Sequence, residues 1–139
     1  MIFSTDCWQV SHRWDARYPG YLIVPAKEAV TELSELSPSA LSEMGTVLKM
    51  TEQLLTTFCQ PIKVVFYKLG FSHGFNCHFH AAPVTKALLE EIAAHSGYSS
   101  ESDGNDAILY LSCEYCERPL NNQERQVIAL TVSRPRQLC

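Results

Sequence analysis

The sequence contains no long apolar run, no dense group of basic residues and no repeated or low-complexity segment. Because no apolar stretch approaches the length that crosses a bilayer, we expect no membrane-spanning segment. The Lys and Arg residues stand singly or in pairs and the net charge is −4, which argues against a surface for extended nucleic acid. A small nucleotide ligand is still compatible with this charge. The first residues show no basic segment followed by an apolar one, so we expect no signal peptide and a cytoplasmic protein.

Cysteines are present, at positions 7, 59, 77, 113, 116 and 139, but a cytoplasmic chain of this size keeps its thiols reduced. Cys113 and Cys116 form a C-x-x-C pair that has no second pair and no redox motif around it. We therefore favour a structural role for this pair over zinc or redox chemistry. Cys77 is expected to be a small buried hydrophobic residue.

The composition is that of one globular domain over residues 1–139, with 46% hydrophobic and 19% charged residues. Alternating and apolar segments predict strands over 8–14 and 21–24. The turn at Pro19-Gly20 makes them an antiparallel hairpin. Ser37 as N-cap and Pro38 at the first helical position predict a long helix that ends before Pro61, and its apolar stripe indicates core packing.

The second half of the chain predicts further short elements. Strands are expected over 64–67 and around His78, followed by a helix that Thr85 caps. A mobile loop is expected over 98–106, a C-terminal strand over 108–111, and a last helix that starts at Asn121 and stops before Pro135. The order of elements indicates an α+β fold with an antiparallel sheet, one long helix and two shorter helices.

The most informative segment of the chain is Asn76-Cys77-His78-Phe79-His80-Ala81-Ala82-Pro83. Side chains alternate along a strand, so Asn76, His78 and His80 share one face while the residues between them share the other. Two imidazoles on one face can converge on a single phosphate or metal ion.

Three interpretations of the histidine pair are open. The two residues can be ordinary surface or core histidines. They can be metal ligands, with His73, Cys113 or Cys116 as further ligands. They can also act on phosphorus, where a neutral imidazole attacks and a second imidazole assists. This third chemistry needs no metal, but the other ring nitrogen of the nucleophile must donate a hydrogen bond. A deaminase-type zinc site is ruled out because no acid follows the histidine and no Pro precedes the C-x-x-C.

The segment 76–83 resembles the histidine-triad motif, in which His-x-His-x-His is followed by two apolar residues and often Pro. Upstream, Asp15 before the turn and the run 20–25 are similar to the second strand of that family, and the segment 32–38 is similar to the entry into its long helix. The resemblance covers roughly residues 8–83, the motif core, and leaves the predicted C-terminal strand and helix over 107–134 outside it.

The resemblance implies an α+β fold that forms a homodimer and uses no cofactor. It also implies hydrolase or nucleotidyl transferase activity at the α-phosphate of nucleotide conjugates, such as dinucleoside polyphosphates or nucleoside phosphoramidates. His78 corresponds to the nucleophile, which forms a covalent nucleotidyl-histidine, and His80 to a residue that contacts the phosphate or assists the leaving group. Asp15 lies near the acidic residue that binds ribose hydroxyls, and we also place Leu22 and His73 at the substrate.

The sequence departs from the family pattern at three places. Asn76 stands where the first histidine is expected, and it can form hydrogen bonds but cannot titrate. Pro19-Gly20 replaces another histidine, and Ser72-His73-Gly74 replaces the usual Gly-Gln-Ser/Thr loop, so His73 is either a phosphate contact or a simple loop residue. Two alternatives to the enzyme are therefore kept: a nucleotide-binding or regulatory protein with little turnover, and a metal-binding protein that uses His78 and His80.

Overall fold

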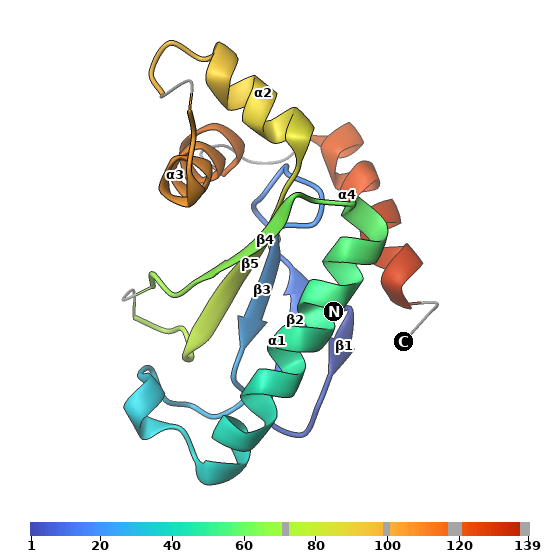
Figure 1. Cartoon of the computed structure of the whole chain (residues 1–139). Helices are drawn as coiled ribbons and strands as arrows, with labels where there is room; N and C mark the ends of the chain where they lie inside the picture. The colour runs from blue at the N-terminus through green and yellow to red at the C-terminus, as the bar shows by residue number, and fades with distance from the viewer. Residues whose placement is uncertain (71–72, 99–100, 117–120, 137–139) are drawn as a thin grey trace.

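A computed structural model describes residues 1–70, 73–98, 101–116 and 121–136 (Figure 1). One antiparallel sheet has the strand order β1-β2-β3-β5-β4, and four α-helices surround it in the described part of the chain. This arrangement confirms the predicted α+β class. The strands are β1 (Phe3–Ser4), β2 (Gln9–His12), β3 (Leu22–Pro25), β4 (Lys63–Tyr67) and β5 (His78–Val84).

β2 and β3 form the predicted antiparallel hairpin, in which His12 pairs with Leu22. Gly20 has a φ of +88°, a conformation that glycine adopts without steric cost and that the turn requires. The strand expected over 8–14 is shorter than predicted and ends at His12. The ring of His12 accepts the N–H of Gly20 at 3.1 Å through Nε2 and bonds the Arg13 carbonyl at 2.9 Å through Nδ1. These backbone groups are therefore taken up by a side chain.

The long helix α1 (Pro38–Cys59) covers one face of the sheet (Figure 1). It begins as predicted, because the Ser37 hydroxyl accepts the Ala40 N–H at 3.2 Å, and it ends where Gln60 turns into the left-handed region with φ 48°. Its apolar stripe packs on the odd-numbered side of β5. The core on this face includes Val24, Cys77 and Ala81. Cys77 is buried here, as expected.

The opposite face of the sheet is covered at one end only. Helices α2 (Lys86–Ala94) and α3 (Gly104–Tyr115) lie together over that end (Figure 1). Their buried residues pack against Tyr21, Tyr67 and Ala82 in a second cluster. Thr85 caps α2 as predicted, accepting the Leu88 N–H at 3.1 Å. The histidine end of this face is left without a helix over it, within the described residues.

The strand predicted over 108–111 is wrong, because this segment lies inside α3, so the count of two shorter helices is wrong as well. The helix starts within the segment expected to be a loop. Asp103 accepts the N–H groups of Asn105 and Asp106, and the Asp106 carboxylate accepts the Asp103 N–H. The short apolar run was the basis for predicting a strand, but this reciprocal cap favours a helix. The spacing of Ala107 and Leu111 also places both on one buried helix face.

The last helix, α4 (Asn122–Arg136), starts at the predicted capping pair. Asn121 accepts the Glu124 N–H at 2.8 Å, and Glu124 accepts the Asn121 N–H at 2.9 Å. The predicted stop before Pro135 is wrong. Pro135 lies one residue before the end of the helix at Arg136, so its missing N–H removes one hydrogen bond of the last turn and no later turn has to form. No helix in the described ranges combines the length and the apolar character needed to cross a bilayer.

Candidate active site

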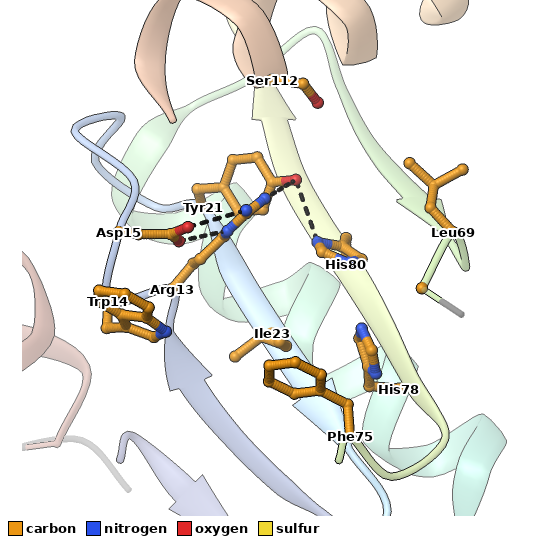
Figure 2. Close-up of a pocket in the computed structure, with 11 residues that line it drawn as sticks. Arg13, Trp14, Asp15, Tyr21, Ile23, Leu69, Phe75, His78, His80 and Ser112 are labelled. Carbon is orange, nitrogen blue, oxygen red and sulfur yellow. Dashed lines mark hydrogen bonds and ion pairs between the residues drawn. The ribbon is translucent and has the colours of Figure 1, made fainter. Parts of the chain in front are cut away.

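A cleft of about 410 Å³ lies on the sheet face opposite α1 (Figure 2). In Figure 2, Trp14 and Leu69 stand on opposite sides of the cleft and Ser112 enters from α3 at one end. The two histidines form part of its floor. Its lining comprises Arg13, Trp14, Asp15, Tyr21, Ile23, Leu69, Gly70, Phe75, His78, His80 and Ser112.

His78 and His80 stand on the same face of β5, as the alternation of the sequence predicted. β5 pairs with β3 on one side and β4 on the other, and His80 lies opposite both Ile23 and Tyr67. The two imidazole rings have centroids 5.1 Å apart. They are only 9% and 8% exposed, so both rings are held by the protein and present little more than one edge to the cleft.

His78 has one ring nitrogen committed to the backbone. Its Nδ1 lies 2.7 Å from the carbonyl oxygen of Asn76. A carbonyl only accepts, so Nδ1 carries the proton and the neutral ring has its lone pair on Nε2. Among the described residues, Nε2 has no hydrogen-bond partner. This is the proton arrangement that a nucleophilic imidazole requires.

Gly70 gives the His78 ring its room. A Cβ at this position would lie 2.8 Å from Cε1 of His78, closer than real Cβ contacts come, and 3.0 Å from Nε2, which is also a tight contact. Any side chain here would therefore push on the nitrogen that faces the cleft. The absence of a side chain at residue 70 is part of the construction of the site.

Asn76 stands next to the site and does not line the cleft. Its side-chain amide donates to the Ala26 carbonyl at 2.9 Å, which ties the start of β5 to the segment after β3. Its main-chain carbonyl is the acceptor for His78. The part that Asn76 plays in the described geometry is thus to position the His78 ring, and no proton transfer by its side chain is needed for that.

His80 is enclosed by two tyrosines. The ring of Tyr67 stacks on it with centroids 5.0 Å apart and planes 4° apart, and the Tyr21 hydroxyl lies 3.1 Å from Nδ1. The hydroxyls of Tyr21 and Tyr67 are hydrogen-bonded to each other. Arg13 donates from Nη1 to the Tyr21 oxygen at 3.2 Å. Burial lowers the pKa of His80 to about 4, and the nearby charge of Arg13 adds to the effect, so the ring is neutral near pH 7.

Asp15 lines the cleft, but it is not a free carboxylate. Arg13 donates to it twice, from Nε to Oδ1 at 2.5 Å and from Nη2 to Oδ2 at 3.0 Å. Although burial disfavours the charged guanidinium, the hydrogen bonds to Asp15 raise the pKa of Arg13 above its usual range. The single cation in the described cleft lining is therefore permanently charged and paired.

Two predicted substrate residues lie away from the cleft. Leu22 is buried in the core on the α1 side, and its neighbour Ile23 faces the cleft instead, because successive residues of β3 alternate. His73 is exposed in a turn and is not part of the cleft lining. Cys113 and Cys116 are free thiols at the end of α3.

The metal interpretation finds no further ligand. Within residues 1–70, 73–98, 101–116 and 121–136, no group of three or more His, Cys, Asp or Glu side chains could hold a metal ion. The additional ligands that the sequence suggested, His73, Cys113 and Cys116, are not gathered with His78 and His80. The surroundings of the pair are instead aromatic and hydroxyl groups.

No family model matches the chain, and no curated protein matches it in sequence. Solved structures do match its fold. A Hit-like protein involved in cell-cycle regulation from Bartonella henselae superposes with a TM-score of 0.63 at 9% identity, over 99% of this chain and 84% of that one. The chain has the histidine-triad fold.

Two further solved structures share the histidine-triad fold. A hypothetical histidine triad nucleotide-binding protein from Sulfolobus tokodaii has a TM-score of 0.62 at 11% identity, over 99% of this chain and 83% of that one. A Zn-bound histidine triad family protein from Mycobacterium smegmatis has a TM-score of 0.58 at 12% identity, over 99% and 84%. Identities this low establish the histidine-triad fold, and the chemistry has to be argued from the site itself.

Sequence reasoning missed Tyr21 and Tyr67, which contact His80, and Arg13, which reaches His80 through Tyr21. Tyr21 precedes β3 and shares the face of Ile23, so strand alternation could have placed it. Tyr67 is the last residue of β4, and only the register of β4 against β5 brings it opposite His80. Arg13 follows β2 and reaches the site across the hairpin through Tyr21.

Proposed function

We propose that this protein is a metal-independent hydrolase or nucleotidyl transferase that acts on the α-phosphate of a nucleotide conjugate through Nε2 of His78. The observation that carries the proposal is the 2.7 Å hydrogen bond from His78 Nδ1 to the Asn76 carbonyl. It fixes the tautomer in which Nε2 bears the lone pair and faces a cleft that also holds His80. An ordinary core histidine would have both nitrogens occupied, as His12 has.

The reaction divides into two displacements. The Nε2 lone pair of His78 attacks phosphorus, the bond from phosphorus to the leaving group breaks, and the leaving group departs with the electron pair and takes a proton from solvent. Water, or another acceptor hydroxyl in a transfer, then attacks the phosphorus and loses its proton. The P–N bond breaks and its electrons return to Nε2. The proton that the leaving group gains and the proton that water loses balance over the cycle.

The other residues that line the cleft also fit a nucleotide. Trp14, Leu69, Phe75 and Ile23 offer apolar and aromatic surface for a base. Asp15 is our candidate for the ribose hydroxyls. Each of its oxygens accepts one bond from Arg13, and a carboxylate has further lone pairs for hydroxyl donors. The net charge of −4 and the scattered basic residues fit a small ligand better than a nucleic acid.

The test uses adenosine 5′-phosphoramidate and a dinucleoside polyphosphate as substrates, each with and without EDTA. We expect turnover that survives the chelator, is abolished in His78→Ala and persists in His95→Ala, an exposed histidine outside the cleft. A short reaction quenched in base should trap nucleotide covalently on the wild-type protein. Turnover that needs a metal, or that survives in His78→Ala, would overturn the mechanism.

The alternative function is nucleotide binding without turnover. It shares the cleft and differs only in the chemical step, so calorimetry separates the two. Tight binding with no product and no covalent adduct would favour a regulatory protein. Stoichiometric zinc that is retained through purification and lost in His80→Ala would favour a metal-binding protein.

Homodimerisation is part of the same proposal. β4 lies at one edge of the sheet, and the outer side of an edge strand can pair with another strand. Light scattering on the purified protein tests this, with a mass of twice 15.6 kDa expected for the dimer. A single-chain mass across the concentration range would exclude it.

A further inference from the structure

We propose that Tyr21 positions a proton on Nε2 of His80, so that the two histidines of the cleft carry their protons on opposite ring nitrogens. His78 then presents a lone pair to the substrate and His80 presents an N–H donor. The inference deepens the proposed function and rests on it for its chemical meaning, but the tautomer itself is measurable without turnover.

The count of protons around the Tyr21 hydroxyl supports this assignment. Arg13 can only donate, so the Tyr21 oxygen accepts its Nη1–H. Tyr21 has one proton left to donate, either to Nδ1 of His80 at 3.1 Å or to the Tyr67 oxygen. These two choices give opposite tautomers of His80.

In the first choice the hydroxyl protons of both tyrosines are donated in hydrogen bonds. Tyr21 donates to Nδ1 of His80, Tyr67 donates to the Tyr21 oxygen, and the Tyr21 oxygen accepts twice. In the second choice Tyr21 donates to Tyr67 and accepts from Nδ1–H of His80. The Tyr67 proton would then have no acceptor among the described residues, in a side chain that is only 9% exposed. A buried unpaired hydroxyl is unfavourable, so the first choice is the stable one.

The electrostatics of a bound phosphate point the same way. His80 lines the cleft beside His78, and its Nε2 has no partner among the described residues. A phosphoryl oxygen is an anionic acceptor, which an N–H stabilises and a lone pair repels. The neutral ring can therefore serve as a donor without being protonated. Burial and the nearby Arg13 keep the pKa of His80 low, in agreement with this role.

Arg13 polarises the same chain of hydrogen bonds. Its guanidinium donates to the Tyr21 oxygen and lies 5.2 Å from the centre of the Tyr21 ring. A positive group that donates to a hydroxyl oxygen makes the remaining O–H a stronger donor. Asp15 holds that guanidinium in place through its two bonds. The chain Asp15, Arg13, Tyr21, His80 is thus a fixed path that ends at the substrate.

The experiment is ¹⁵N NMR of histidine-labelled protein near pH 7, in which each ring nitrogen reports whether it bears a proton. We expect wild-type His80 as the Nε2–H tautomer and His78 as the Nδ1–H tautomer. Tyr21→Phe keeps the ring and removes the hydroxyl, and it should move His80 toward a mixture of tautomers. Tyr18→Phe is the matched control, because its buried hydroxyl bonds the Pro83 carbonyl at 2.6 Å outside the cleft. It should leave both signals unchanged.

Kinetics give the second measurement. Loss of one preorganised donor to the reacting group lowers kcat by about 10²- to 10³-fold. Because Tyr21→Phe shifts only part of the His80 population to the other tautomer, it should lower kcat about tenfold and change KM much less. Tyr67→Phe removes the competing acceptor of the Tyr21 proton, so His80 should keep the Nε2–H tautomer, and kcat should change less than in Tyr21→Phe. A wild-type Nδ1–H tautomer at His80, or a Tyr21→Phe spectrum equal to wild type, would overturn the inference. If the protein binds nucleotide without turnover, the NMR experiment still tests the tautomer of His80 independently of the proposed function.

Discussion

The aromatic ring of Tyr67 lies parallel to the imidazole ring of His80, with their planes 4° apart and their centroids 5.0 Å apart. The contact shields part of one face of the imidazole from water. The edge of Tyr21 approaches the same imidazole at nearly a right angle, with centroids 5.8 Å apart. Desolvation destabilises the charged form of a histidine enclosed in this way, and this makes the stability of the fold depend on pH.

We expect the free energy of unfolding to fall as the pH drops from about 6.5 to about 4. His80 has a lower pKa in the folded chain than in the unfolded chain, so the unfolded chain binds more protons in this window. The stabilisation is complete above the unfolded pKa and is lost below it. A shift from 6.5 to about 4 corresponds to at most about 3 kcal/mol. Urea titrations at steps of half a pH unit measure the slope.

The control for this slope is a pair of variants. His80→Gln removes the titrating ring and should flatten the dependence, whereas His73→Gln removes an exposed histidine in a turn and should leave it unchanged. Burial also lowers the pKa of His12, and that contribution is the same in both variants. Equal slopes in His80→Gln and wild type would contradict the prediction.

A side chain at Gly70 should damage the site. Gly70→Ala puts a Cβ against Cε1 and Nε2 of His78, and overpacking of this kind costs about 1–3 kcal/mol. We expect a lower melting temperature together with loss of covalent adduct formation. Gly45→Ala is the matched control. It lies in α1 with no atom near the new Cβ, so it should stabilise the protein by about 0.5–1 kcal/mol with activity retained.

Trp14 should report nucleotide binding through its fluorescence. It is 81% exposed at the cleft, whereas the other tryptophan, Trp8, is buried and donates to the Ala40 carbonyl. Stacking of a base on Trp14 should quench the emission. Trp14→Ala should weaken binding by about 1–2 kcal/mol, roughly 5- to 30-fold in Kd. Quenching that persists in Trp14→Phe would show that the signal comes from Trp8, and an unchanged Kd in Trp14→Ala would show that the base binds elsewhere.

The cap of α3 can be tested by two substitutions at one position. Asp103→Ala removes the acceptor for the Asn105 and Asp106 N–H groups, and loss of such a cap costs about 0.5–2 kcal/mol. Asp103→Asn keeps an acceptor oxygen, so it should lower the free energy of unfolding by only a few tenths of a kcal/mol, roughly. Thermal unfolding followed by circular dichroism compares them. Equal stability of Asp103→Ala and wild type would mean that the segment does not begin a helix at this point.

The sequence predicts those features that depend on local order along the chain. The two faces of β5, the cap at Ser37 and the turn at Gly20 each follow from a few neighbouring residues. The surroundings of His80 do not, because Tyr21 and Tyr67 come from separate strands and meet only through the register of the sheet. The prediction for the segment 104–115 was wrong for a different reason. Its short apolar run fits strand and helix equally well, and the Asp103 cap decided between them.

The division of β5 into a core face and a cleft face sets how this strand responds to mutation. Cys77, Phe79 and Ala81 belong to the packing under α1, so a substitution scan should register there as loss of soluble protein. At His78 and His80 the same scan should yield folded protein that has lost its chemistry. From Ala82 onward the alternation ends, since α2 and α3 cover that face too. Two phenotypes that alternate residue by residue up to His80, and become one from Ala82 onward, would mark the boundary of the candidate site along a single strand.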